Sequence, residues 1–263
     1  MSRALAVLAL VLTTAAPSVA QTFSAQATQG GSSSPDFLSR FDFYVGIEHL
    51  GSDDPRFVWD AQWGGQLDLI DYGRGALTFA AIYQTILGNE FREFDPNQGN
   101  YMLGGSASIR AGAVEVAGVF HHVSRHLSDR PKRFPVDWNM IGGRVYGGIA
   151  RGRTLVRAQV DVRGVIEKSF VDYDWEVDGG SRVQVGLTPR FAFVGSGGVR
   201  LVGVDGSRDR GDQYGWRGEG AVRIDGGAAA LELFVAGERR IDPYQLEFST
   251  VTWLTTGFRL VSR

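Results

Sequence analysis

Residues 156–163 read Val-Arg-Ala-Gln-Val-Asp-Val-Arg, so apolar and polar side chains alternate along the stretch. Alternation with a period of two is typical of a β-strand, because successive side chains of a strand point to opposite faces. The same alternation returns in residues 175–187, 216–224 and 231–238. We therefore expect an all-β protein whose strands carry one apolar face and one charged face.

The expected strands are about 10 to 15 residues long, which is more than the five or six usual in globular proteins and close to the length that crosses a membrane. Short connections alternate with longer polar ones, a pattern typical of a transmembrane antiparallel up-and-down β-barrel. A secreted soluble β-sandwich or barrel would alternate too, but it would turn its apolar face inward and would not need so many aromatic residues near its strand ends. Twelve strands are expected, near residues 41–49, 57–70, 76–87, 100–110, 113–126, 138–150, 154–166, 172–187, 191–203, 214–224, 228–240 and 247–261.

The first twenty residues are predicted to be a secretory signal. A positive start at Arg3 is followed by an apolar run over 4–16 and a small-residue cleavage site at 18–20. That run has about 13 residues, too few for a membrane-spanning helix. Residues 21–36 are predicted to be a flexible leader and 37–263 the barrel, exported to the outer membrane.

Composition excludes several classes of function. The 27 basic and 29 acidic residues leave a net charge of −2, which disfavours nucleic acid as a partner. The chain has no cysteine, so thiolate metal sites and cysteine nucleophiles are excluded.

If the apolar faces meet lipid, the charged faces point into the lumen. Charges of both signs can pair across strands there, so we expect a filled interior rather than a channel lined by one charge. A small channel is therefore the less favoured reading. The residues expected to point inward are Arg157, Asp161, Arg163, Glu176, Asp178, Arg182, Arg200, Arg217, Glu219, Arg223, Glu232 and Glu238.

A polar cluster lies near the end of the expected strand 113–126. His122, Ser124 and His126 share one face there, in the same register as apolar residues that should meet lipid. A serine hydroxyl needs a neighbouring base before it can act as a nucleophile. Asn139, in the lipid-facing register of the next strand, is expected opposite His122 or Ser124, where its amide could hold the imidazole in the required tautomer.

These residues resemble outer-membrane phospholipase A. The resemblance rests on His122-x-Ser124 followed across a hairpin by Trp138-Asn139, on a barrel of this size, although Arg125-His126 follow the serine where the family has Asn-Gly. It implies that Ser124 is the nucleophile, His122 the base and Asn139 its orienting partner, acting on acyl esters of outer-membrane lipids. It also implies a homodimer and a calcium ion near the serine, for which Ser128 and Asp129 are the nearest candidate ligands. Lipid A deacylases share similar His-x-Ser logic on a smaller barrel, so phospholipid and lipid A both remain candidate substrates.

Other readings of the histidines stay open. His122 and His126, two residues apart, could chelate a metal, although no third ligand is evident. The cluster could instead belong to an interfacial girdle that binds lipid phosphate, and the protein would then be a non-enzymatic outer-membrane barrel with a structural or ligand-binding role. The basic residues that would share the phosphate are Arg125, Arg130, Lys132 and Arg133.

Overall fold

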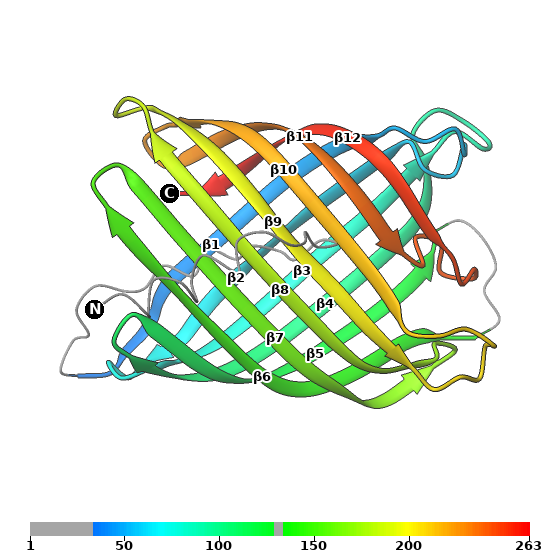
Figure 1. Ribbon diagram of the computed structural model, residues 1–263, viewed down its shortest axis with the longest axis horizontal. Coiled ribbons are helices and arrows are strands. Elements are labelled where there is room, and N and C mark those ends of the chain that lie inside the picture. The colour runs from blue at the N-terminus through cyan, green and yellow to red at the C-terminus, as the bar shows by residue number, and fades with distance from the viewer. Residues whose placement is uncertain (1–33, 129–133) are drawn as a thin grey trace, which may run out of the picture.

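The computed structural model describes residues 34–128 and 134–263, and these form a closed barrel of twelve antiparallel strands (Figure 1). The fold predicted from the alternating pattern is confirmed, including the number of strands. The strands are β1 (Asp36–Leu50), β2 (Trp59–Asp71), β3 (Ala76–Gly88), β4 (Asp95–Ala111), β5 (Val114–Leu127), β6 (Val136–Arg151), β7 (Thr154–Ser169), β8 (Tyr173–Gly186), β9 (Phe191–Val204), β10 (Gln213–Asp225), β11 (Ala229–Ile241) and β12 (Thr250–Ser262).

Each strand pairs with its neighbours in sequence, and β1 pairs with β12 to close the barrel, from Tyr44 opposite Val261 to Leu50 opposite Thr255. One expected connection is wrong in part. Residues 88–99 lie between the expected strands 76–87 and 100–110, but β4 already begins at Asp95, which pairs with Gly88. A register shift next to Leu87 allows this pairing to continue, and such an irregularity leaves no clear mark in the alternation of side chains.

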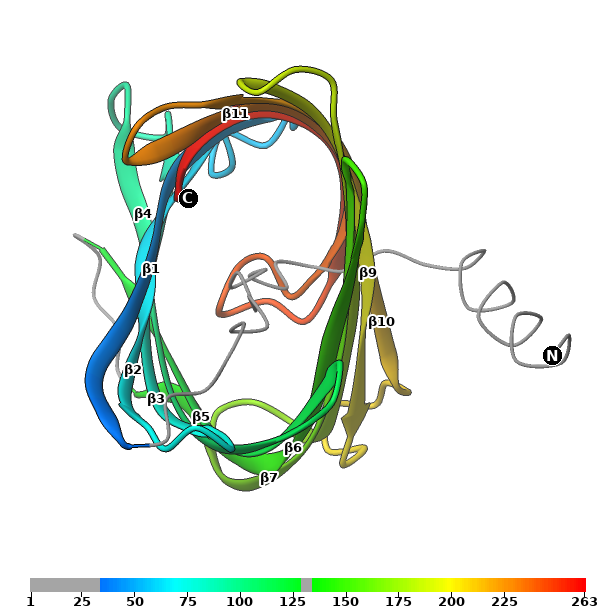
Figure 2. The same ribbon diagram turned by 90° about the vertical axis from the view of Figure 1, so that its left-hand side faces the viewer.

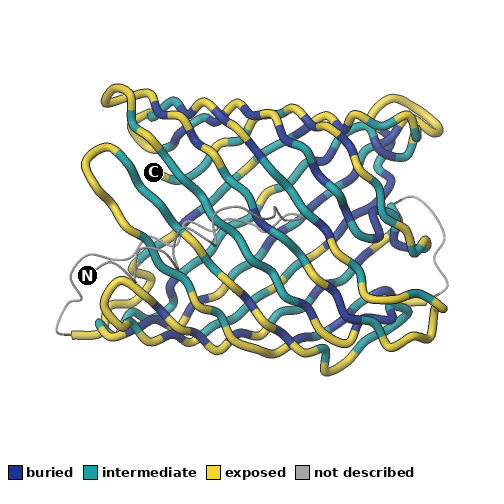
Figure 3. The backbone as a smooth tube through the Cα atoms, in the orientation of Figure 1, coloured by how far each residue is buried: buried dark blue, intermediate teal, exposed yellow. Residues whose placement is uncertain are grey.

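The two faces of the wall divide as the pattern predicts. In β7, Val160 and Val162 are 48% and 55% exposed on the outside, whereas Asp161 and Arg163 are 2% and 6% exposed. Figure 3 shows the same alternation of buried and exposed positions along many strands. The barrel therefore presents apolar side chains outward and charged side chains to its lumen.

The connections differ at the two ends of the barrel. Tight turns join β4 to β5 and β6 to β7, where Gly112 and Gly152 adopt positive φ angles of 64° and 61° that favour glycine. The longer connections lie at the opposite end, and the C-terminus lies at the end of the tight turns (Figure 1). This arrangement places the C-terminal end of β5 and the start of β6 at the long-loop end.

Inside the barrel, ion pairs join neighbouring strands and also strands that are not neighbours in the wall. Glu232 on β11 is fully buried and accepts hydrogen bonds from Arg182 on β8, Arg223 on β10 and Arg259 on β12. Glu48 on β1 likewise accepts from Arg217 on β10. The expected inward orientation and pairing is confirmed for Arg182, Arg217, Arg223 and Glu232.

The connection between β11 and β12, residues 242–249, folds into the barrel at the long-loop end, where Figure 2 shows it within the bore. Arg125 donates to the backbone oxygens of Asp242 and Pro243 at 2.9 and 3.1 Å. Tyr173 donates to the Asp242 carboxylate at 2.6 Å, and Gln98 donates to the Pro243 oxygen at 2.9 Å. We call residues 242–249 the plug segment.

The plug segment and the ion pairs together lead us to expect negligible channel activity. Both occupy the bore, and a conducting path needs continuous water through it. The folded protein, inserted into planar bilayers beside an open porin as positive control, should give no large conductance steps. Stable, large steps would show that the lumen is open and would favour a channel.

Residues 1–33 lie outside the described part of the chain, so the secretory signal and nearly all of the predicted leader remain predictions. In residues 34–128 and 134–263 there is no helix of the length and apolar character needed to cross a membrane.

Candidate active site on the outer wall

The predicted serine, histidine and asparagine lie on the outer surface of the β5–β6 wall, close to the long-loop end. They share this surface with Phe120 and Ile141, which are 45% and 52% exposed. The antiparallel register sets His122 directly opposite Asn139. The expected outward orientation and the expected pairing across the hairpin are both present.

His122 and Asn139 begin a short chain of hydrogen bonds. The Asn139 Nδ2 amide donates to Glu167 Oε2 on β7 at 2.9 Å, and its Oδ1 lies 2.8 Å from His122 Nδ1. A carboxylate only accepts, so Glu167 fixes which way the asparagine amide points. The Asn139 oxygen then accepts from His122, whose Nδ1 carries the proton, and a neutral His122 keeps a free lone pair on Nε2.

The strict alternation of side chains along β7 does not predict that Glu167 lies on the outer wall. Val160 and Val162 point outward, and counting on in steps of two would send Glu167 into the lumen with Asp161. A register shift between β6 and β7 next to Asn139 breaks that count, and Asn139 pairs directly with Glu167. Ile166 and Glu167 are both exposed as a result. Because a β-bulge adds one residue to one strand, it can bring a lumen-register residue to the outer wall.

Ser124 has a different imidazole partner from the expected one. Its Oγ lies 2.9 Å from His126 Nε2, and this is the Ser124–imidazole hydrogen bond found among the described residues. His126, two residues further along β5, is exposed on the same outer face. The structure thus brings His122 together with Asn139 as expected, and it sets Ser124 against the second histidine.

An aromatic row continues from His126 around the wall. Its ring meets Tyr101 of β4 edge to face with centroids 5.3 Å apart. Tyr101, Tyr83 of β3 and Trp63 of β2 follow one another at 4.8 and 4.5 Å, and Tyr101 lies directly opposite Ser124. Aromatic side chains at this level are typical of the boundary between lipid and water.

Of the two candidate calcium ligands, the structure describes only Ser128. Ser128 directly follows β5, and its backbone N–H donates to the Asn97 oxygen at 3.1 Å. Asp129 lies outside the described residues. Within the described ranges, no three histidine or acidic side chains gather closely enough to hold a metal ion.

Solved structures share this architecture. Outer membrane phospholipase A from Escherichia coli superposes with a TM-score of 0.53 at 10% identity, over 86% of this chain and 98% of that chain. The Salmonella typhi phospholipase, a dimer with bound calcium, gives 0.52 at 11% identity, over 85% and 90% of the two chains. KdgM porin gives 0.49 at 6% identity, over 83% and 97%.

This chain has the fold of an outer-membrane β-barrel. Because the identities are so low, the likeness shows the fold and leaves the activity open. No family model matches the chain, and no curated protein sequence matches it either. In outer-membrane barrels the short turns face the periplasm and the long loops face outward, so this fold puts Ser124 near the outer rim.

Proposed function

We propose that the protein is exported to the outer membrane and hydrolyses acyl esters of lipids there, at its lipid-facing wall. Ser124 is the nucleophile, His122 the base and Asn139 the residue that orients the base. The observation that carries the proposal is the hydrogen-bonded chain His122–Asn139–Glu167 beside an outward-facing serine.

The proposed reaction follows from these groups. A rotation about the Ser124 Cα–Cβ bond would release Oγ from His126 and turn it toward His122. The serine oxygen then bonds to the acyl carbon while its proton passes to His122 Nε2, and the ester C–O bond breaks as that proton moves to the leaving alcohol. Water, deprotonated by the same imidazole, then bonds to the acyl carbon. The bond from that carbon to Ser124 Oγ breaks, the imidazole returns its proton to Oγ, and the fatty acid leaves.

The position on the wall suits a lipid substrate. A phospholipid or lipid A would approach laterally in the membrane, so the reaction needs no opening into the lumen. The aromatic row that ends at Tyr101 and His126 lies at the same level as Ser124 and supports a substrate whose head group sits at the membrane surface.

The phospholipase structures lend limited support. One of the Escherichia coli structures is an active-site mutant in which an asparagine is replaced by alanine, so an asparagine belongs to that enzyme's active site. Asn139 would be its counterpart. The calcium-bound dimer of the Salmonella typhi protein supports a homodimer and a calcium ion as proposals for this chain. The described residues do not complete a calcium site, so no step of the reaction is assigned to the metal.

Acyl release tests the proposed function. Purified protein, folded in detergent, should release fatty acid from radiolabelled phospholipid or lipid A, and Ser124→Ala should abolish that release. Parallel reactions with calcium or with a chelator show whether the metal is needed. Absence of release from both lipids would remove the enzyme hypothesis.

A non-enzymatic barrel is the second candidate function. It is favoured by the Ser124–His126 hydrogen bond, because a serine and histidine in an interfacial girdle would pair in the same way without a reaction. In that case the wall would bind lipid head groups, and the assay above would find no acyl release.

Glu167 gives a further prediction for this site. Glu167→Ala removes the acceptor that fixes the Asn139 amide, so the amide can flip and the His122 proton can shift from Nδ1 to Nε2. We expect ¹⁵N NMR of the histidine rings to show mainly Nδ1–H for His122 in the wild type and a mixture in the variant. Glu167→Gln, whose amide oxygen can still accept, should behave like the wild type. An unchanged His122 tautomer in Glu167→Ala would contradict the role of Glu167, whatever the acyl-release assay shows.

A further inference from the structure

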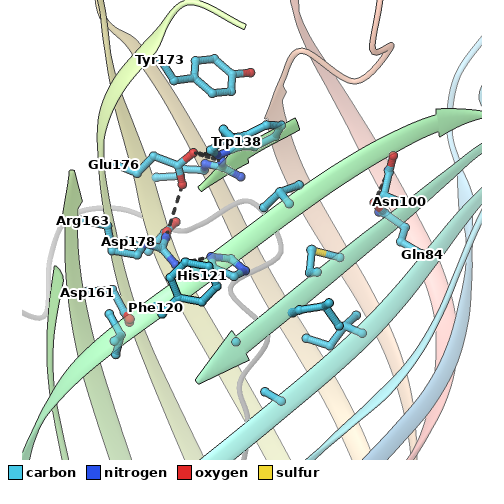
Figure 4. Close-up of a pocket in the computed structure, with 18 of the residues that line it drawn as sticks. Gln84, Asn100, Phe120, His121, Trp138, Asp161, Arg163, Tyr173, Glu176 and Asp178 are labelled. Atoms are coloured by element: carbon cyan, nitrogen blue, oxygen red, sulfur yellow. Dashed lines mark hydrogen bonds and ion pairs between the residues drawn. The ribbon is translucent and has the colours of Figure 1, made fainter. Parts of the chain in front are cut away.

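The lumen contains a cavity of about 180 Å³ beneath the plug segment, shown in Figure 4. Its lining comes mainly from residues of β2–β9 and β11 that face the lumen, and from Asp242 and Pro243 of the plug segment. A single water needs about 10–15 Å³ of such space, so the cavity could hold a small organic solute. Nothing in the lipid-facing site uses this cavity.

One wall of the cavity is charged. Arg163 donates to His121 Nδ1 at 2.8 Å and to the Asp178 carboxylate. Glu176 accepts from Trp138 Nε1 at 3.0 Å and from Arg200 at 2.6 Å. Figure 4 shows the labelled members of this wall gathered on one side of the cavity.

The opposite side is made of amides. Asn100 Nδ2 donates to Gln84 Oε1 at 2.8 Å, and Gln84 in turn donates to Asp60 at 2.7 Å. These two residues lie across the view from the charged wall in Figure 4. The cavity is therefore lined by polar groups on both sides.

Three buried polar atoms of the lining residues lack a hydrogen-bond partner. They are Nε of Arg163, Nε of Arg200 and Oδ1 of Asn100, and both Arg163 and Asn100 are only 6% exposed. Leaving such a group unpaired destabilises the structure, so a solute that supplies the missing hydrogen bonds is favoured. The two arginine atoms are donors and the asparagine atom is an acceptor.

The charge of the lining indicates the sign of the occupant. The lining contains more guanidinium groups than carboxylates, and Arg125 donates to backbone and amide oxygens of Asp242, Pro243 and Gln98. An anion is therefore favoured over a cation. The lining arginines are Arg125, Arg144, Arg163, Arg200 and Arg240, and the lining carboxylates are Asp161, Glu176, Asp178 and Asp242.

We propose that this cavity binds a small hydroxylated carboxylate. The carboxylate accepts from the free N–H groups of Arg163 and Arg200, and a hydroxyl donates to Asn100 Oδ1. The plug segment covers the bound solute from the long-loop end through its bonds to Arg125 and Tyr173. This binding site is separate from the outer wall and does not depend on the lipid-hydrolysing function.

Gluconate and sorbitol are a matched pair of probes. They differ at one end, where gluconate has a carboxylate and sorbitol has an alcohol. We expect gluconate to change the tryptophan fluorescence of the detergent-folded protein in a saturable way and sorbitol to leave it unchanged. Trp138→Phe should remove most of this fluorescence change. Trp138 lines the cavity, whereas the other five tryptophans of the chain are not among the lining residues.

Four variants test whether gluconate binds in the cavity. Arg200→Gln and Asn100→Leu should each weaken gluconate binding at least tenfold. Arg223→Gln, which removes another lumenal arginine that does not line the cavity, should bind like the wild type. Ser124→Ala should also bind like the wild type, so a failure here is distinct from a failure of the acyl-release assay. No saturable response to gluconate, an equal response to sorbitol, or equal losses in Arg200→Gln and Arg223→Gln would overturn the proposal.

Discussion

Glu232→Gln is expected to lower the free energy of unfolding of the barrel by about 3–5 kcal/mol, the usual cost of removing one member of a buried ion pair. The fully buried Glu232 carboxylate holds three guanidinium groups, those of Arg182, Arg223 and Arg259. An amide of the same shape has no charge to offer them, and its NH₂ group cannot accept. Like charges would then face one another inside the lumen.

Glu247→Gln is the matched control for this prediction. Glu247 also bonds an arginine, Arg56, but its side chain is 50% exposed at the long-loop end. An exposed pair contributes at most about 1 kcal/mol. Urea unfolding of both variants in lipid vesicles, followed by tryptophan fluorescence, measures the difference. Equal losses in the two variants would mean that the lumenal ion pairs are solvated as well as those of the loops.

The second large effect concerns the choice of base. Replacing His122 by alanine should reduce acyl release by about 10²–10⁴-fold, because general-base catalysis contributes that much. His126→Ala should keep or raise the activity, since it removes the partner that holds Ser124 Oγ away from His122 in this structure. Initial rates of fatty-acid release, measured at equal amounts of folded barrel, decide between the two histidines.

The opposite result would be equally informative. If His126→Ala lost as much activity as Ser124→Ala while His122→Ala stayed active, the Ser124–His126 pair would itself be the catalytic dyad. The His122–Asn139–Glu167 chain would then be structural. The acyl-ester hydrolase proposal would survive that outcome with a different base.

The sequence was sufficient for the barrel because the fold depends on a local pattern. An alternation of apolar and polar residues with a period of two, as in residues 156–163, indicates directly which side chains face lipid and which face the lumen. The same count placed His122 and Asn139 on one face, and the antiparallel register of β5 and β6 then set them opposite one another. Each of these steps involves residues close in sequence or directly paired across a hairpin.

The tertiary structure determined three features that the alternation of side chains does not predict: the position of Glu167, the plug segment and the partner of Ser124. Glu167 reaches Asn139 only because an irregular register breaks the count of two, and the plug segment enters the bore through bonds to Gln98, Arg125 and Tyr173, far away in the sequence. Ser124 has a histidine two residues away on either side, so the sequence treats His122 and His126 alike. The three-dimensional packing separates them, because Asn139 across the hairpin engages His122 and leaves His126, against Tyr101, to hold the serine.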